Sequence, residues 1–386
     1  MASVEIEQIT QSSRLQPRCK TSAVRGQPVH LPSGFPHFLN SPMSWLGKQY
    51  SDVASYAVVL DSEDLAELDG ALVHFKTLGL DGDLVDRVNF PLPQLSKKLK
   101  AMRQEVYRGR GFALLRGLDP NAYSVDDSAI IYLGIQCYIG NRFGRQDKKG
   151  NMMVHIVADN SSPNTAEHHR HSTAPITFHN EESGDVIGWL TRSTAASGGK
   201  CIIASAHTVY NVIAATRPEL IRVLARSDWP FALARSVDRP KFHCRPVLQH
   251  YKGQMIINFS RTALMGSASH PRSPSLPQLT PIQVEALDAI EAIAKATQLE
   301  MKTIAGDMHF INNFAVLHRR EGFVDGAQAS EKRHLVRMRL RDDELGWAVP
   351  EELQPEWTQA FREVGSKVWH LVPMPEGFFL LRGQVN

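Results

Sequence analysis

Residues 176–185, ITFHNEESGD, place a histidine two residues before a glutamate in a run that reads as a strand entering a turn. On an extended segment, His179 and Glu181 project to the same side with Cβ atoms about 6.6 Å apart, so both could bind one metal ion. Such triplets are common in a chain with 16 histidines, and the alternative for His179 is a buried histidine bonded to backbone. A third ligand would complete the two-histidine, one-carboxylate arrangement, which is typical of non-heme Fe(II) oxygenases because it leaves coordination positions open.

His318 is the best third ligand, because it ends an apolar strand in NNFAVLHRREGF and charged residues follow it. The histidines of the EHHRH cluster are expected in a solvated loop, where no carboxylate stands at matching spacing. The histidines inside strand patterns are expected to be satisfied in the core or at its rim. The first group is His168, His169 and His171, and the second is His155, His309 and His334.

A basic strand, KRHLVRMRLR, follows the His318 loop, and its period-2 alternation separates two faces. One face carries Arg333, Leu335, Arg337, Arg339 and Arg341, and the other carries His334, Val336, Met338 and Leu340. Arg339 and Arg341 are expected to be solvated, as basic side chains usually are. Arg333 and Arg337 are candidate anion ligands, because an interior guanidinium binds a carboxylate in a bidentate way. They lie about 13 Å apart on a strand, so each suits a different anion.

Short apolar runs between turn residues predict strands through much of the chain. The clearest are residues 111–118, 151–157, 185–192, 198–205, 245–251, 254–260 and 333–341. Lys252-Gly253 is a two-residue connection that suits a hairpin. Helices are expected at residues 61–79, after the strand at 198–205, and from Thr280, where Pro281 stands in the first turn. Without an internal repeat or a long linker, these elements predict one domain of antiparallel strands with helices outside, at residues 31–386, after a disordered tail at residues 1–30.

The composition is that of a soluble globular protein: 386 residues, 42% hydrophobic and 22% charged, with a mean hydropathy of −0.25. Lys plus Arg (43) nearly equals Asp plus Glu (40), so no overall field favours nucleic acid or a membrane surface. No stretch approaches the roughly 20 apolar residues of a membrane span. The N-terminus lacks the apolar stretch of a secretory signal, and the widely spaced Cys19, Cys137, Cys201 and Cys244 suggest reduced thiols. A cytoplasmic location is therefore expected.

The ordered series GFALLRGL, HNE, SGGKCIIAS, VYN, GQMIINFSR, GDMHFINNFAVLHRREGF and RHLVRMRL resembles the taurine-dioxygenase-like branch of the Fe(II)/2-oxoglutarate-dependent oxygenases. This branch includes clavaminate synthase and many fungal biosynthetic enzymes, and the resemblance covers about residues 45–340. It implies an α+β, mainly β fold. A double-stranded β-helix, or jelly roll, would occupy about residues 110–342, between an N-terminal helical layer and a C-terminal extension.

The resemblance also implies roles for single residues. His179, Glu181 and His318 would hold Fe(II), although aspartate is commoner than glutamate at position 181. Arg333, fifteen residues beyond His318, would bind the far carboxylate of the cosubstrate 2-oxoglutarate. Arg337 matches an arginine that binds an anionic group of the substrate in some members. Two alternatives stay open for it: a contact with 2-oxoglutarate, or an internal salt bridge. Cys201 stands where relatives often have a serine or threonine that contacts 2-oxoglutarate, and a thiol is a weaker donor.

The implied reaction is oxidation of an unactivated C–H bond of a small molecule by O2, with succinate and CO2 as coproducts. Hydroxylation, desaturation and cyclisation all stay open, and an amino acid or another carboxylate-bearing secondary metabolite would fit Arg337. The rival interpretation is a non-catalytic jelly-roll protein whose three ligands hold a structural ion in a filled coordination sphere. A nucleic-acid or histone demethylase is disfavoured by the charge balance. No nucleic acid or membrane partner is expected, and a homo-oligomer is compatible with the family.

Overall fold

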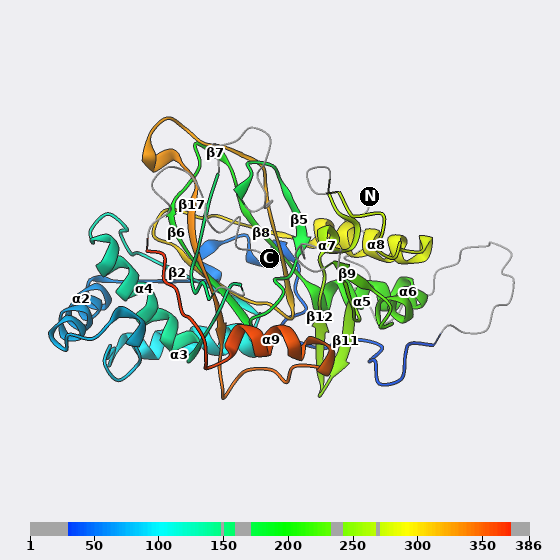
Figure 1. Cartoon of the computed structure of the whole chain (residues 1–386), viewed down its shortest axis with the longest axis horizontal. Helices are drawn as coiled ribbons and strands as arrows, with labels where there is room; N and C mark the ends of the chain where they lie inside the picture. The colour runs from blue at the N-terminus through cyan, green and yellow to red at the C-terminus, as the bar shows by residue number, and fades with distance from the viewer. Residues whose placement is uncertain (1–29, 148–149, 159–170, 233–241, 268–270, 372–386) are drawn as a thin grey trace, which may run out of the picture.

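Two β-sheets face each other, and helices cover their outer faces (Figure 1). The computed structural model describes residues 30–147, 150–158, 171–232, 242–267 and 271–371. The expected tail at residues 1–30 thus lies outside the described residues except for its last one. The paired antiparallel sheets confirm the mainly β, jelly-roll fold that the sequence predicted, with the helical layer at the N-terminal side.

The larger sheet has the strand order β1-β2-β14-β6-β17-β3, and β4 pairs with β17 as well. Its pairs are antiparallel except the parallel pair of β1 with β2. The strands are β1 Ala57–Val59, β2 Phe112–Arg116, β3 Arg142–Gly144, β4 Val154–Val157, β6 Val186–Ser193, β14 Met308–Asn312 and β17 His334–Arg341. Strand β17 has neighbours on both sides, so the basic strand of the sequence lies inside the sheet.

The smaller sheet has the antiparallel order β13-β8-β15-β5. Its strands are β5 Ile176–His179, β8 Cys201–Ser205, β13 Leu299–Met301 and β15 Val316–Arg320. Three two-stranded ribbons complete the β structure: β7 Ser197–Gly198 with β16 Phe323–Val324, β9 Pro230–Ala232 with β10 Phe242–Cys244, and β11 Leu248–Tyr251 with β12 Gln254–Ile257. The last is the expected hairpin, in which Lys252 and Gly253 both have positive φ, as a tight two-residue turn requires.

Helices on the larger sheet are α2 Ser62–Thr77, α3 Leu95–Tyr107 and α4 Val125–Ile139, and those near the smaller sheet are α5 Ala206–Thr216, α6 Pro218–Leu224, α7 Arg261–Met265 and α8 Pro281–Thr297. Helix α9, Gln354–Phe361, follows near the C-terminal end. Short 3-10 turns occupy Gly47–Tyr50, Val53–Ser55, Gly82–Leu84, Ala329–Glu331 and Glu351–Leu353. Helix α2 begins after Asp61, whose carboxylate accepts from the N–H groups of Glu63 and Asp64. Helix α8 begins after Thr280, as predicted.

The described residues form four hydrophobic core clusters, of which one packs around α9 and includes Trp347 and Trp357, and the other three form layers. One lies between the larger sheet and helices α2 to α4, a second lies between the smaller sheet and helices α5, α6 and α8, and a third fills the space between the sheets. The third layer includes Phe112, Trp189, Ile203 and Leu335, each at most 8% exposed. Full burial of such a side chain contributes about 1.5–3 kcal/mol. This layer fixes the distance between the two inner faces, which carry the site.

The expectation that Arg339 is solvated is wrong, because the basic face of β17 points between the sheets. Leu335 of that face packs in the inter-sheet core, and the opposite face, with Val336 and Met338, packs under the helices. Arg339 is only 6% exposed. Arg341, also expected to be solvated, keeps partial exposure and pairs with the buried Asp185 at 2.9 Å.

Within the described part of the chain, no helix is long and apolar enough to cross a membrane. Cys137, Cys201 and Cys244 are free thiols, as expected. Cys19 lies outside the described residues.

Candidate metal centre

His179 and His318 meet because their strands are antiparallel neighbours. The pairing of β15 with β5 sets the two residues directly opposite each other, and their ring centroids are 4.2 Å apart. His318 shares its face of the sheet with Val316, a member of the inter-sheet core. Both imidazoles therefore project into the space between the sheets.

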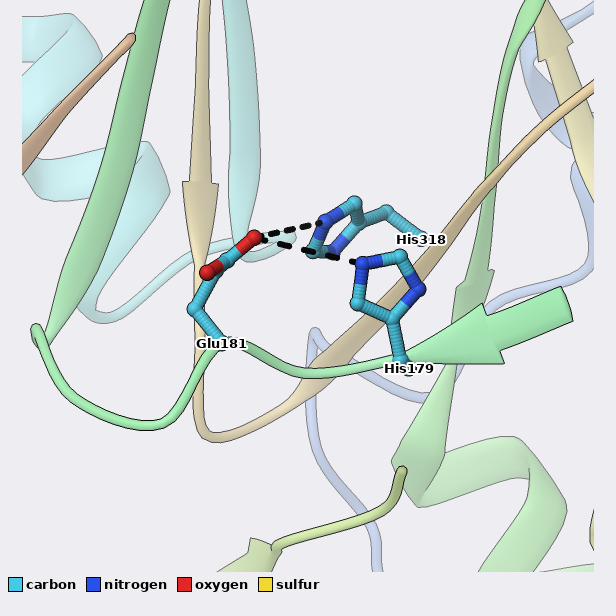
Figure 2. A group of neighbouring side chains, drawn as sticks. All are labelled: His179, Glu181 and His318. Atoms are coloured by element: carbon cyan, nitrogen blue, oxygen red, sulfur yellow. Dashed lines mark ion pairs between the residues drawn. The ribbon is translucent and has the colours of Figure 1, made fainter. Parts of the chain in front are cut away.

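Glu181 follows β5 and directs its carboxylate at both imidazoles (Figure 2). Its Oε1 lies 3.9 Å from Nε2 of His179 and 3.8 Å from Nε2 of His318. One ligand atom from each of the three residues falls within 4.8 Å of the others. The three side chains that the sequence predicted as metal ligands thus lie together in the structure.

Two buried asparagines hold this arrangement. Asn180 donates its amide to the backbone carbonyls of Asn313 at 2.7 Å and Val316 at 3.2 Å. Asn313 accepts from the N–H of Glu181 at 2.9 Å and donates to the carbonyls of Glu181 and Gly184, both at 3.0 Å. These bonds tie the turn that carries Glu181 to the turn that leads into β15 and His318.

The tautomer of His179 follows from its hydrogen bond. Its Nδ1 lies 2.9 Å from the carbonyl of Thr177, and a carbonyl only accepts, so Nδ1 carries the proton. Nε2 is then the unprotonated nitrogen, and it faces Glu181. Such a backbone contact is the usual way in which a protein orients a metal-binding imidazole.

Glu181 stays ionised although it is buried. Burial alone would raise its pKa, but the guanidinium of Arg337, the nearby imidazole of His318 and the charge of Arg339 together lower the pKa well below its ordinary value. Arg337 pairs through Nη1 with Oε1 of Glu181 and donates from Nη2 to Oε1 of Gln146 at 3.2 Å. A carboxylate must be deprotonated to bind a metal, and this one is held so.

Arg333 lies apart from these residues, near the turn between β7 and β8. It is 7% exposed, donates from Nε to the carbonyl of Gly199 at 3.2 Å and lies 5.5 Å from the ring centroid of Phe323. Burial lowers its pKa to about 10. Among the described residues, no carboxylate oxygen comes within 4.0 Å of its guanidinium. The carboxylate of Asp325 accepts from the backbone N–H of Arg333 at 2.8 Å and its charge opposes the lowering of the Arg333 pKa. A buried guanidinium that no carboxylate contacts directly is a fitting anion site.

Cys201 lies close enough to Arg333 for the two groups to influence each other. Burial raises the pKa of the thiol to about 12, and the charge of Arg333 opposes that shift. The thiol is therefore protonated at neutral pH and offers one weak S–H donor beside the guanidinium.

The histidines that were expected in the core or at its rim lie there, but one histidine that was expected to be solvated is buried. His155 and His334 lie on the outer face of the larger sheet and contact each other at 2.8 Å between Nδ1 and Nε2. His309 is buried against Trp189, with ring centroids 4.9 Å apart. His171 is not solvated but 2% exposed, because it packs beside Val157 and contacts that residue's carbonyl. His168 and His169 lie outside the described residues.

Some site residues escaped the sequence analysis. Alternation along 185–192 already puts Trp189 on the inner face of β6, where its ring centroid lies 6.5 Å from that of His318. Arg339 was recognised as sharing a face with Arg337, but it was expected to be solvated, and it is 6% exposed. No sequence pattern marks Gln146, which reaches Arg337 from the loop between β3 and β4.

Two imidazole nitrogens and one ionised carboxylate oxygen suit a ferrous ion, and a triad leaves positions for further ligands. The residues present thus fit the metal that this donor set implies, and Arg333 lies apart from them as a buried guanidinium.

Comparison with known proteins agrees with this chemistry. The family model described as "Taurine catabolism dioxygenase TauD, TfdA family" matches residues 75–339. The "Taurine hydroxylase-like protein SAT17" of Stachybotrys chartarum is 32% identical over 347 residues, which are 87% of this chain and 89% of that protein. The "FR-33289 synthase" of Streptomyces rubellomurinus is 23% identical over 76% of this chain and 87% of its own length.

Solved structures share the fold. An asparagine oxygenase in complex with Fe(II), 2S,3S-3-hydroxyasparagine and succinate superposes with a TM-score of 0.58 at 18% identity, over 76% of this chain and 98% of that one. The non-heme iron oxygenase OrfP, in complex with Fe, succinate and (3S)-hydroxy-L-Arg, gives 0.55 at 15% identity, over 74% and 94%. The chain therefore belongs to the TauD/TfdA family of Fe(II)- and 2-oxoglutarate-dependent dioxygenases.

Proposed function

We propose that this dioxygenase oxidises an unactivated C–H bond of a small molecule at a ferrous ion held by His179, Glu181 and His318. The observation that carries the proposal is the convergence of one atom from each of these residues within 4.8 Å, between the two sheets. When bound there, iron with 2-oxoglutarate and O2 supplies the oxidising power, and succinate and CO2 are the coproducts.

The chain's own groups prepare the ligands. His179 presents Nε2 because Thr177 holds the proton on Nδ1. Glu181 presents an ionised carboxylate because the surrounding positive charge outweighs the cost of burial. The asparagine pair holds the backbone of Glu181 against the turn before His318, so the donors are placed before a ligand arrives.

Arg333 is proposed to bind the far carboxylate of 2-oxoglutarate and so to orient the cosubstrate. Its burial supports this role, as does the lack of a described carboxylate within 4.0 Å of its guanidinium, since an anion there would gain a charge-assisted bond in a water-poor site. Cys201 would stand beside that carboxylate as a weak donor, so Arg333 supplies most of the affinity.

The substrate is proposed to be an amino acid or another carboxylate-bearing metabolite of secondary metabolism. Arg337 contacts both Glu181 and Gln146, so an anionic group paired with Arg337 would sit near the metal ligands. The hydroxylated asparagine and arginine in the similar solved structures support this class. An Arg337→Leu variant separates the roles: weaker 2-oxoglutarate binding with unchanged substrate binding would contradict this assignment.

The test is an anaerobic titration of the Fe(II)-loaded protein with 2-oxoglutarate, which should produce the visible charge-transfer band of an iron-bound keto acid. The His179→Ala variant should lose the band. His309→Ala removes a buried histidine that stacks on Trp189 and lies outside the triad, so it should keep the band. Bound iron without any band would favour the rival function, a structural ion in a filled site.

Three broader expectations join this proposal. Residues 31–386 would form one domain, the enzyme would reside in the cytoplasm, and it could associate as a homo-oligomer. Light scattering on the purified chain determines the oligomeric state, and limited proteolysis tests the single domain.

A further inference from the structure

The two carboxylate oxygens of Glu181 meet different partners. Oε1 faces His179 and His318 and accepts a hydrogen bond from Nη1 of Arg337, whereas Oε2 lies 3.6 Å from Nη2 of Arg339. Arg339 is itself fixed, because its Nη1 donates to Oγ of Ser183 at 2.9 Å and to the carbonyl of Arg145 at 3.3 Å.

Glu181 needs such a partner more than a shorter aspartate would. Its extra methylene adds a rotatable bond, so the carboxylate can turn either oxygen, or both, toward a metal. A carboxylate that binds through both oxygens fills one more coordination position, and carboxylates bind metals in either mode. A keto acid and O2 need three positions between them, so the carboxylate must bind through one oxygen.

We infer that Arg339 is a positioning residue that holds Oε2 of Glu181 away from the metal, so that this carboxylate binds through Oε1 alone. The inference rests on the proposed function and deepens it. The burial of Arg339 supports it, since at 6% exposure water screens the ion pair weakly. Arg339 contacts Oε2 and none of the three proposed ligand atoms. It would therefore set the number of open coordination positions on the metal, and the metal could still bind without it.

The experiment compares Arg339→Gln with Arg341→Gln in the full chain. Arg341 is a matched control, because it lies two residues further on the same face of β17 and pairs with a carboxylate, Asp185, that is not a metal ligand. Three quantities are measured anaerobically: Fe(II) affinity, the dissociation constant of 2-oxoglutarate from its charge-transfer band, and the absorption spectrum of the Co(II)-substituted protein, which reports coordination number.

We expect Arg339→Gln to retain Fe(II) and to bind 2-oxoglutarate about 10- to 100-fold more weakly, the usual range for residues that orient a ligand. Its Co(II) spectrum should shift toward a higher coordination number. Arg339→Lys, which keeps a positive charge, should recover part of the affinity. Arg341→Gln should lower stability but leave 2-oxoglutarate affinity and the Co(II) spectrum as in the wild type.

Wild-type 2-oxoglutarate affinity and Co(II) spectrum in Arg339→Gln would overturn the inference, as would equal effects of the Arg339 and Arg341 variants. If Arg339→Gln does not fold, Ser183→Ala loosens the arginine without removing its charge, and it must show a smaller shift in the same direction. Failure of the proposed function is separate: it would be the absence of the charge-transfer band in the wild type itself.

Discussion

The side chain of Asn313 makes two hydrogen bonds to the backbone of Glu181. Its oxygen accepts from the Glu181 N–H at 2.9 Å, and its nitrogen donates to the Glu181 carbonyl at 3.0 Å. The two residues are 132 positions apart in the sequence. Asn313 also stands in the turn between β14 and β15, five residues before His318. One amide thus links the carboxylate ligand to the strand of the distal histidine.

Asn313→Ala should therefore loosen the metal centre and the fold together. It leaves three backbone groups without this partner, one buried at Gly184 and two part-buried at Glu181, and a fully buried one costs about 1–3 kcal/mol. Urea unfolding should show a lower free energy of unfolding, and Fe(II) should bind more weakly. Asn141→Ala is the control, because Asn141 makes a similar two-way contact with Asp343 at an exposed site. An unchanged Fe(II) affinity in Asn313→Ala would contradict the positioning role.

Gly199→Ala should weaken 2-oxoglutarate binding by displacing Arg333. Gly199 has φ +72°, and an added Cβ would lie 3.0 Å from Cδ of Arg333. Gly253→Ala is the matched control, since Gly253 has φ +79° but nothing within 4 Å of an added Cβ. Both variants should lose about 1–2 kcal/mol of stability from the left-handed conformation. Only Gly199→Ala should need more 2-oxoglutarate to saturate the charge-transfer band, and equal titrations would count against Arg333 as the cosubstrate ligand.

Metal binding should stabilise the fold, because the ligands come from segments far apart in the chain. At a free Fe(II) concentration 100 times the dissociation constant, the free energy of unfolding should rise by about 2.7 kcal/mol. His318→Ala should abolish that gain, and His74→Ala, on the exposed side of α2, should keep it. Anaerobic urea unfolding with and without metal measures the difference. An equal gain in the His318 variant would place the metal elsewhere.

Local sequence patterns picked out the three side chains that converge in the structure, for a physical reason. A strand period of two puts His179 and Glu181 on one side, and His318 was recognisable as the polar end of an apolar strand. A local sequence pattern does not show which element packs against each face of a strand. The alternation in β17 correctly separated its two faces, but whether the basic face met water depended on the smaller sheet that packs against it, as Leu335 shows by packing with Ile203 and Val316. That is why Arg339 was misplaced.

Helices that are buried on most sides are equally hard to predict from a local sequence pattern. Helix α4 is buried on most sides, for Ile131, Ile135 and Gln136 are all fully enclosed, so its sequence has no polar face to reveal a helical period. Helices α2 and α8 were found because caps and exposed faces mark them. Gln146 could not be found at all, since its role follows from a loop meeting a strand 191 residues later.

Asp185 should make stability depend on pH in a direction opposite to that of most carboxylates. Burial raises its pKa from the ordinary 3.8 to about 6, although Arg341 and Trp357 both oppose the shift. Between these two values the folded chain keeps a proton that the unfolded chain has lost. The free energy of unfolding therefore falls as pH rises through this window, and the contribution is fully present only below pH 3.8.

An Asp185→Asn variant cannot titrate there, so its stability relative to the wild type should rise by about 2 kcal/mol between pH 4.5 and pH 7. Urea unfolding across this range measures the change. Asp127→Asn is the control, because a hydrogen bond from Lys76 lowers the pKa of Asp127. The Asp127 carboxylate is therefore ionised in both the folded and the unfolded chain over most of this pH range. Its stability difference should stay nearly constant. A constant difference for Asp185→Asn as well would mean that Asp185 is ionised throughout, held by Arg341 strongly enough to offset its burial.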